Sequence, residues 1–219
     1  MKDALKSYFA GDLFNHKDLT GNAALASRLT AASGNRWKVL LPQDSESNCA
    51  RAVEEIRSRD LELLSQCDVL VANFDGQELD SGTVAEFMYA KFLDIPAVLL
   101  RTDFRSCSDQ QAGGEPWNLM CSGYPRTHSL ILHGMTLYHE CFNREGSLEE
   151  KMVMYHDRIA RKLIAELEAV IAEPPWLGRD IAVDHYRRAV QSAGNGLERL
   201  LTGEVLAALV AGKISRGML

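Results

Sequence analysis

The sequence lacks long apolar segments, dense basic runs and paired cysteines. Of its 219 residues, 46% are hydrophobic, but the longest apolar stretches, such as Val205 to Ala211, are far shorter than the roughly 20 residues of a membrane-spanning helix. The 24 Lys and Arg are dispersed and are outnumbered by 30 Asp and Glu, which gives a net charge of −6. We therefore expect neither a membrane nor a nucleic-acid polymer as partner, whereas a small nucleoside or nucleotide fits this charge.

The cysteines and the first residues indicate where the protein acts. The five cysteines are scattered and form no CxxC pair: Cys49, Cys67, Cys107, Cys121 and Cys141. We interpret them as reduced thiols, most of them buried. The segment from Met1 to Lys6 lacks the apolar core of a secretion signal, so the sequence predicts a cytoplasmic protein.

Apolar runs alternate with helical patterns along the first two thirds of the chain. The predicted strands cover residues 6–10, 38–41, 68–73 and 97–100, with two further short strands at 130–132 and 136–138, and the predicted helices cover 19–32, 49–66 and 82–93. The longer apolar runs are unbroken, as in strands that are covered on both faces. The sequence therefore predicts an α/β fold with a doubly wound, mostly parallel sheet of the flavodoxin or Rossmann-like type.

The remainder of the chain has helical periodicity. The predicted helices are 148–172, 180–192 and 197–211, and Pro174 and Pro175 end the first of them. We therefore divide the chain into an α/β domain, residues 1–145, and a helical extension, residues 146–219. We expect this extension to pack on the core or on a second subunit. Residues 105–114 are polar and glycine-rich and predict a loop.

Acidic residues follow the predicted strands. In doubly wound sheets, ligands bind beyond the carboxyl ends of the strands. The carboxylates in these positions are Asp12, Asp44, Asp75, Asp80 and Glu86. Glycine-rich phosphate loops are absent from the same positions, which predicts carboxylate chemistry on a polar, uncharged ligand.

The segment from Asp80 to Glu86 allows two interpretations. In the first, Thr83 and Glu86 form a capping box at a helix start, and Asp80 stabilises the preceding turn. In the second, a carboxylate attacks the anomeric carbon of a sugar, a reaction that passes through an oxocarbenium-like transition state. Spacing alone does not separate these interpretations.

Five ordered motifs resemble one enzyme family. They are D-x-G-T-x-x-E at residues 80–86 followed by Tyr89-Ala90, the segments Tyr8 to Phe14, Leu41-Pro42-Gln43 and Arg57 to Asp60, and P-x-N-L-M at residues 116–120. Together they span residues 6–122 and are similar to the nucleoside 2-deoxyribosyltransferases. This resemblance implies that Glu86 is the nucleophile, that Asp60 exchanges a proton with the base, and that Asp80 holds a sugar hydroxyl. A solvated position on a helix is the alternative for Asp60.

The same resemblance implies further substrate-binding residues. Gln43 is expected to recognise the base and Phe14 to pack against it, while a solvated loop residue and a core aromatic are the respective alternatives. Asn118 is expected to reach the 5′-hydroxyl of a substrate in a neighbouring subunit, with a plain turn residue as the alternative. Gly11 and Met120 belong to the matched motifs and are expected at the substrate.

The resemblance implies a retaining transfer of 2-deoxyribose between nucleobases in two displacement steps. The partners would be 2′-deoxynucleosides and free nucleobases, the protein would be a homo-oligomer, and carboxylates would serve without metal or cofactor. The spacing of His128, His133 and His139 does not fit a zinc site. The carboxylates of Asp12 and Asp80 favour nucleosides over 5′-monophosphates. The alternatives are an N-glycoside hydrolase acting on 2′-deoxynucleosides or deoxynucleotides, a nucleoside-sensing module, and a structural domain that has lost its active site.

Overall fold

The computed structural model describes residues 4–45, 53–105 and 115–219. Within these residues, five strands form one parallel sheet in the order β2-β1-β3-β4-β5. The strands are β1 (Leu5–Ala10), β2 (Trp37–Leu40), β3 (Val69–Asn73), β4 (Ala97–Arg101) and β5 (Thr127–Ile131). In the register, Ser7 of β1 lies opposite Val39 of β2 and Val69 of β3. The predicted α/β fold with a parallel sheet is confirmed.

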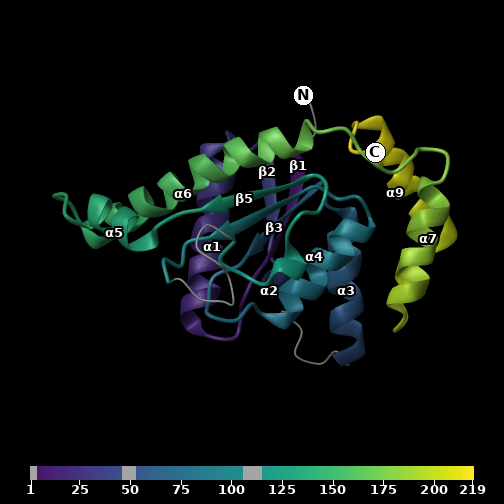
Figure 1. The fold of residues 1–219 in the computed structure, drawn as a ribbon, viewed down its shortest axis with the longest axis horizontal. Coiled ribbons are helices and arrows are strands. Elements are labelled where there is room, and N and C mark those ends of the chain that lie inside the picture. The colour runs from purple at the N-terminus through teal and green to yellow at the C-terminus, as the bar shows by residue number, and fades with distance from the viewer. Residues whose placement is uncertain (1–3, 46–52, 106–114) are drawn as a thin grey trace.

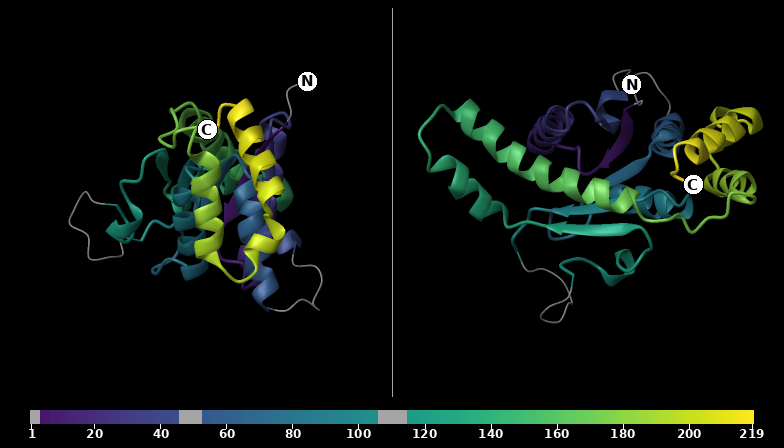
Figure 2. Two further views of the ribbon diagram at one scale, coloured as in Figure 1. Left: turned by 90° about the vertical axis from the view of Figure 1, so that its right-hand side faces the viewer. Right: turned by 90° about the horizontal axis from the view of Figure 1, so that it is seen from above.

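Helices cover both faces of this sheet. The helices of the described residues are α1 (His16–Ala32), α2 (Pro42–Ser45), α3 (Val53–Gln66), α4 (Ser81–Phe92), the 3₁₀ turn η1 (Leu119–Cys121), α5 (Gly134–Phe142), α6 (Leu148–Ile171), α7 (Ala182–Ala193), α8 (Leu197–Leu200) and α9 (Gly203–Ser215). Figure 2 shows α1 and α6 on one side of the sheet, α3 and α4 on the other, and α7 and α9 outside α3 and α4. The C-terminal helices therefore form a third layer on the α3/α4 face.

Successive residues of the central strands feed two cores. Val69 and Val71 face α1 and α6, whereas Leu70 and Ala72 face α3 and α4. Burial on both faces explains why β3 and β4 are continuous apolar runs in the sequence. The edge strand β5 is only partly buried, so its first half is polar and does not form an apolar run. For this reason the sequence predicts a strand at residues 130–132, whereas β5 covers Thr127–Ile131.

Helix α6 packs along the sheet. Its buried residues Ile159, Leu163 and Leu167 share a core with β1 and β3, and Arg28 of α1 pairs with Asp157 of α6 at 2.6 Å. Figure 1 shows α6 crossing the sheet and α5 lying at its far end. The division of the chain at residue 145 stays a prediction, but the first helix after it is packed as part of the α/β layers.

Two predictions of local structure are wrong. Residues 136–138 lie in α5 and not in a strand, because the His133 side chain caps the helix by accepting from the Thr136 amide, and Leu137 and Cys141 are buried one turn apart. The predicted helix 197–211 is interrupted: α8 ends at Leu200, and a second helix, α9, begins after Thr202. For residues 136–138 and 197–211, the residue types alone favour the wrong secondary structure. The burial of particular positions determines which secondary structure forms.

Some predictions concern residues outside the described ranges. Of the predicted helix 49–66, residues 53–66 are confirmed as α3, and residues 46–52 lie outside; so does most of the predicted loop 105–114. Cys67, Cys121 and Cys141 are free and buried, as expected, whereas Cys49 and Cys107 are not among the described residues. Within the described part of the chain, no helix is long and apolar enough to cross a bilayer.

Candidate active site

A buried tyrosine and two carboxylates from three different elements come together next to the sheet. Tyr8 is fully buried in β1, and its hydroxyl donates a hydrogen bond to Oε1 of Glu86 on α4. Burial, and then the negative charges of Glu86 and of Asp60 on α3, raise the pKa of Tyr8 well above its usual value. Asp60 therefore lies within electrostatic reach of the Tyr8–Glu86 pair. The structure thus brings together the two residues that the sequence predicts to be catalytic.

Tyr8 is the residue of this group to which the sequence analysis assigned no role. It was part of a matched motif, but no role followed from its position in a predicted buried strand. A tyrosine is a poor choice for a fully buried core position unless its hydroxyl has a partner. That requirement is the signal that could have pointed to a polar group opposite β1.

A cavity of about 980 Å³ opens beside these carboxylates. Asp60 and Glu86 line it from α3 and α4, and α7 forms the third wall. Apart from these carboxylates, much of the wall is apolar, with Ile56, Met88 and Tyr89 among its side chains. Its volume is at the upper end of the range for small-molecule sites, roughly 300–1,000 Å³. Apolar walls with a few convergent polar or charged groups are typical of a small-molecule site.

Asp80 caps helix α4. Its Oδ2 atom accepts from the Thr83 backbone amide at 2.7 Å and from the Thr83 hydroxyl at 2.8 Å. The interpretation in which Thr83 and Glu86 form a capping box is wrong, because α4 starts earlier, at Ser81, with Asp80 as its N-cap, whereas the stabilisation of this turn by Asp80 is present. Glu86 is therefore not part of the cap, and its side chain is directed to Tyr8 instead.

A second acidic group lies near this cap. Partial burial, and then the negative charges of Asp80 and Asp18, raise the pKa of Asp12. Asp12 follows β1 and Asp80 precedes α4, so two carboxylates approach each other at the carboxyl end of the sheet. The local field at this edge is negative.

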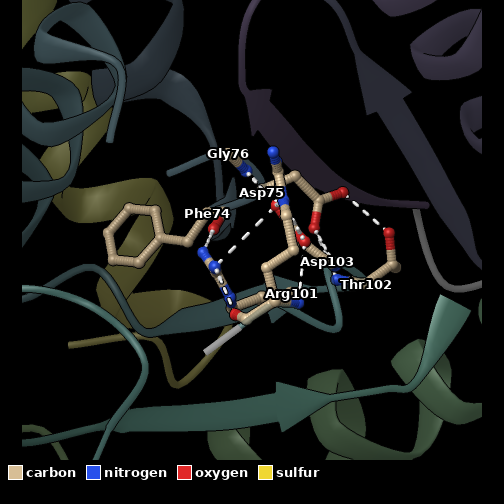
Figure 3. Close-up of polar contacts among 7 residues, drawn as sticks. Phe74, Asp75, Gly76, Arg101, Thr102 and Asp103 are labelled. Atoms are coloured by element: carbon tan, nitrogen blue, oxygen red, sulfur yellow. Dashed lines mark hydrogen bonds and ion pairs between the residues drawn. The ribbon is translucent and has the colours of Figure 1, made fainter. Parts of the chain in front are cut away.

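The loops after β3 and β4 are tied together by charged side chains, as Figure 3 shows. Asp75 accepts from the amides of Thr102 and Asp103 at 2.5 and 2.7 Å, and the Arg101 guanidinium donates to the Phe74 carbonyl. Arg105 holds Asp103 through its Nε atom at 2.9 Å, and this hydrogen bond is the main reason why the pKa of Asp103 falls to about 2. Arg101 and Arg105 are thus both bound to atoms of these two loops. Asp75 holds the backbone of the loop after β4 in place through the Thr102 and Asp103 amides.

The other predicted substrate-binding residues lie apart from the cavity. An added Cβ at Gly11 would lie 3.1 Å from Asn73 Cβ, which explains the glycine at this close approach of β1 and β3. Gln43 donates to the Leu19 carbonyl at 3.0 Å. Phe14 is 78% exposed, so the alternative of a core aromatic is wrong.

Asn118 and Met120 lie on the surface. The Asn118 side chain caps η1 by accepting from the Met120 amide at 2.9 Å, and Met120 is 75% exposed. Neither residue, nor any of Gly11, Phe14 and Gln43, is among the described residues that line the cavity. A local turn-capping role of Asn118 is therefore present, and its predicted role toward a neighbouring subunit stays a prediction.

The histidines do not form a metal-like cluster within residues 4–45, 53–105 and 115–219. The His128 ring contacts Glu166 and Glu173, each at 2.8 Å, and its pKa is raised because these hydrogen bonds outweigh the lowering effect of burial. His133 caps α5 and stacks on Phe104. These contacts are structural.

The fold and the cavity together define the class of this protein: an α/β protein in which two carboxylates, Asp60 and Glu86, line a pocket beside a parallel sheet. A family model described as nucleoside 2-deoxyribosyltransferase matches residues 7–120, which is just over half of the 219 residues. The chain belongs to this family. Tyr8, Asp60 and Glu86 lie within the matched region, whereas α7 lies outside it.

Among the solved structures that this chain matches, two are named 2-deoxyribosyltransferases. One is from Leishmania mexicana, with 26% identity over 54% of this chain and 86% of that chain and a TM-score of 0.44. The other is from Bacillus psychrosaccharolyticus, with 19% identity over 47% and 77% and a TM-score of 0.41. A conserved protein from Enterococcus faecalis V583 is 22% identical over 76% of this chain and 99% of that chain, with a TM-score of 0.48. No curated protein matches this chain.

Proposed function

We propose that this protein transfers 2-deoxyribose from one nucleobase to another through a covalent intermediate on Glu86. Family membership supports an activity of the nucleoside deoxyribosyltransferase type. The observation that carries the specific reaction is the group of Tyr8, Asp60 and Glu86 beside one cavity. It supplies an oriented nucleophile and a second carboxyl group for proton transfer.

In the first step, a carboxylate oxygen of Glu86 attacks C1′ of the 2′-deoxynucleoside. The bond between C1′ and the base nitrogen breaks, and the base leaves with the electron pair while Asp60 provides a proton. In the second step, a nitrogen of the incoming base attacks C1′ from the opposite side, Glu86 departs as carboxylate, and Asp60 takes up the proton. Two inversions at C1′ give net retention. The carboxyl groups of this chain supply both the nucleophile and the acid/base function.

The same cavity supports transfer over hydrolysis. Hydrolysis requires water at C1′ of the intermediate, whereas an apolar wall favours an aromatic base over water. Ile56, Met88 and Tyr89 provide such a wall beside Glu86. The departing base and the acceptor base would occupy this space in turn.

The substrate is a nucleoside and not its 5′-monophosphate. Asp12 and Asp80 form a negative edge, and a phosphate about 4 Å from one carboxylate would lose about 4 kcal/mol per pair of unit charges at an effective dielectric of 20. Arg101 is bound to the Phe74 carbonyl and Arg105 to Asp103, so each side chain already has a partner within its own loops. A 5′-hydroxyl would instead donate to Asp80, whose Oδ2 already caps α4 and whose Oδ1 would accept.

A homo-oligomer completes the proposal. Asn118, Leu119 and Met120 form an exposed turn, with Leu119 and Met120 both largely solvent-accessible. Such a turn suits contact with a second copy, which would bring Asn118 to the sugar of the neighbouring site. Gln43, Phe14 and Gly11 would line the approach to the sugar from the β1 side.

Incubation with 2′-deoxyinosine and adenine tests the proposal. We expect 2′-deoxyadenosine as product, and Glu86→Ala should lower its rate by about a thousandfold or more, the order found when a covalent nucleophile is removed. Glu78→Ala, at an exposed position of the preceding loop, is the matched control and should leave the rate unchanged. Free 2-deoxyribose without a new nucleoside would show a hydrolase, binding without turnover would show a sensing module, and near-normal transfer in Glu86→Ala would refute the assigned nucleophile.

A further inference from the structure

Helix α7 is attached to the body of the protein at both of its ends. At its start, His185 contacts the Phe92 carbonyl and the Tyr186 hydroxyl donates to the Leu93 carbonyl at 2.7 Å. Tyr186 is also fully buried in the core next to α4. The first turns of α7 therefore keep a constant position relative to the C-terminal end of α4.

The other end of α7 is held by helix α3. Arg57 donates to the Ala193 carbonyl at 3.0 Å, and the Ser58 hydroxyl donates to the Asn195 carbonyl at 2.7 Å. Both contacts lie within one turn of Asp60 along α3. Because α7 is attached at both ends, the residues between them form one wall of the cavity that Asp60 and Glu86 also line.

Neighbouring arginines of α7 have different surroundings. Arg188 lines the cavity that also contains Asp60 and Glu86, whereas Arg187 is absent from the lining and pairs with Asp184 on its own helix. Ala189, also on the lining, is small and leaves space beside Arg188. Arg188 thus adds a positive charge to a cavity whose α3 wall carries Asp60 and Arg57 and whose α4 wall carries Glu86, and Arg57 is already bound to the Ala193 carbonyl.

A guanidinium group recognises one class of nucleobase better than another. It has only N–H donors and no acceptor, and it stays protonated at all assay pH values. Hypoxanthine presents an exocyclic carbonyl oxygen at C6, which accepts such donors, whereas adenine presents at the same position an exocyclic amino group, which is itself a donor. A base in this cavity that turns its exocyclic edge to α7 therefore binds better with an oxygen at that edge.

We infer that Arg188 is a specificity-determining residue that selects oxo bases, such as hypoxanthine, over amino bases, such as adenine, at the cavity wall formed by α7. The inference rests on the proposed transfer reaction and deepens it. It concerns a residue outside the matched region 7–120, so this selection belongs to the C-terminal part of this chain.

Competition between two acceptors tests this inference. The enzyme is given 2′-deoxyuridine as donor and equal concentrations of hypoxanthine and adenine, and the initial ratio of 2′-deoxyinosine to 2′-deoxyadenosine is measured. Both products arise from the same glycosyl-enzyme, so their ratio reports only the acceptor step. We expect wild type to favour 2′-deoxyinosine and Arg188→Ala to lower the ratio about tenfold or more, the effect of one hydrogen bond to a charged group.

The neighbouring arginine provides the control. Arg187→Ala removes the same charge from the same helix without changing the lining, so its product ratio should equal that of wild type. An unchanged ratio in Arg188→Ala with transfer intact would overturn the inference and leave the proposed function standing. The absence of any exchanged nucleoside with wild type, both in this competition and with 2′-deoxyinosine and adenine, would overturn the proposed function itself.

Discussion

Tyr8→Phe removes one hydroxyl from the centre of the proposed site and leaves the buried ring in place. The hydroxyl donates to Oε1 of Glu86. Because burial and the nearby carboxylates raise the pKa of Tyr8 well above its usual value, this hydroxyl stays protonated throughout the pH range of an enzyme assay. The variant therefore deletes a permanent donor to the proposed nucleophile.

The magnitude follows from the charge of the acceptor. A hydrogen bond to a charged group contributes about 1.5–3 kcal/mol, and about 1.4 kcal/mol corresponds to one pH unit in a protonation equilibrium. Without the Tyr8 donor, the carboxylate form of Glu86 loses this stabilisation and takes up a proton at higher pH. We expect the acid limb of the pH profile of kcat/KM to move to higher pH by about one to two units.

The assay is base exchange measured from pH 4 to pH 9, with Tyr186→Phe as control. Tyr186 is equally buried, but its hydroxyl donates to the Leu93 carbonyl and not to a carboxylate. Tyr186→Phe should reduce stability without moving the acid limb. An acid limb of Tyr8→Phe that coincides with that of wild type, or an equal displacement in both variants, would refute the role of Tyr8 as donor to the nucleophile.

Two further predictions concern stability. Asp80→Ala should lower the free energy of unfolding, measured by urea denaturation, by about 0.5–2 kcal/mol through loss of the α4 cap. Asp80→Asn keeps a capping oxygen and should lower this free energy less. Equal losses in the two variants would contradict the capping role. His128→Gln should lower the free energy of unfolding at pH 6, because Glu173 and Glu166 stabilise protonated His128 only in the folded protein. This loss of stability should disappear as the pH rises through the raised pKa of His128 in the folded state. His156→Gln, on the exposed side of α6, serves as control, and a loss from His128→Gln that is constant between pH 6 and pH 9 would contradict this linkage.

The α/β layers could be predicted from local patterns. Buried strands such as β3 and β4 are continuous apolar runs because both faces are covered, and α1 and α4 show helical spacing because one side of each faces the sheet. Where burial is incomplete, the pattern fails. The edge strand β5 was misplaced, and α5 was mistaken for a strand because Thr136 and Tyr138 are residue types that favour strands.

The candidate site was predictable only in part. Glu86 lies in a segment that follows a strand, where the parallel topology gathers ligand-binding residues, whereas Asp60, in the middle of α3, was assigned only through the resemblance to the family. Asp80 was placed in the same motif, but its capping of α4 became clear only from the hydrogen bonds to Thr83. The roles of Gln43, Phe14 and Asn118 toward substrate stay predictions, since these side chains lie outside the cavity.

By itself, the sequence determined the buried strands, most of the helices and the parallel α/β class, because each depends on residues that are near one another in the chain. Its motifs also singled out Glu86 and Asp60 as candidates. The tertiary structure alone decided that the Tyr8 hydroxyl meets Glu86 and that α7 closes the cavity with Arg188. These contacts join residues that are far apart in the chain; Tyr8 and Glu86, for example, are 78 residues apart. Their formation depends on how α3, α4 and α7 pack against the sheet, and no local pattern of hydrophobicity or propensity contains that information.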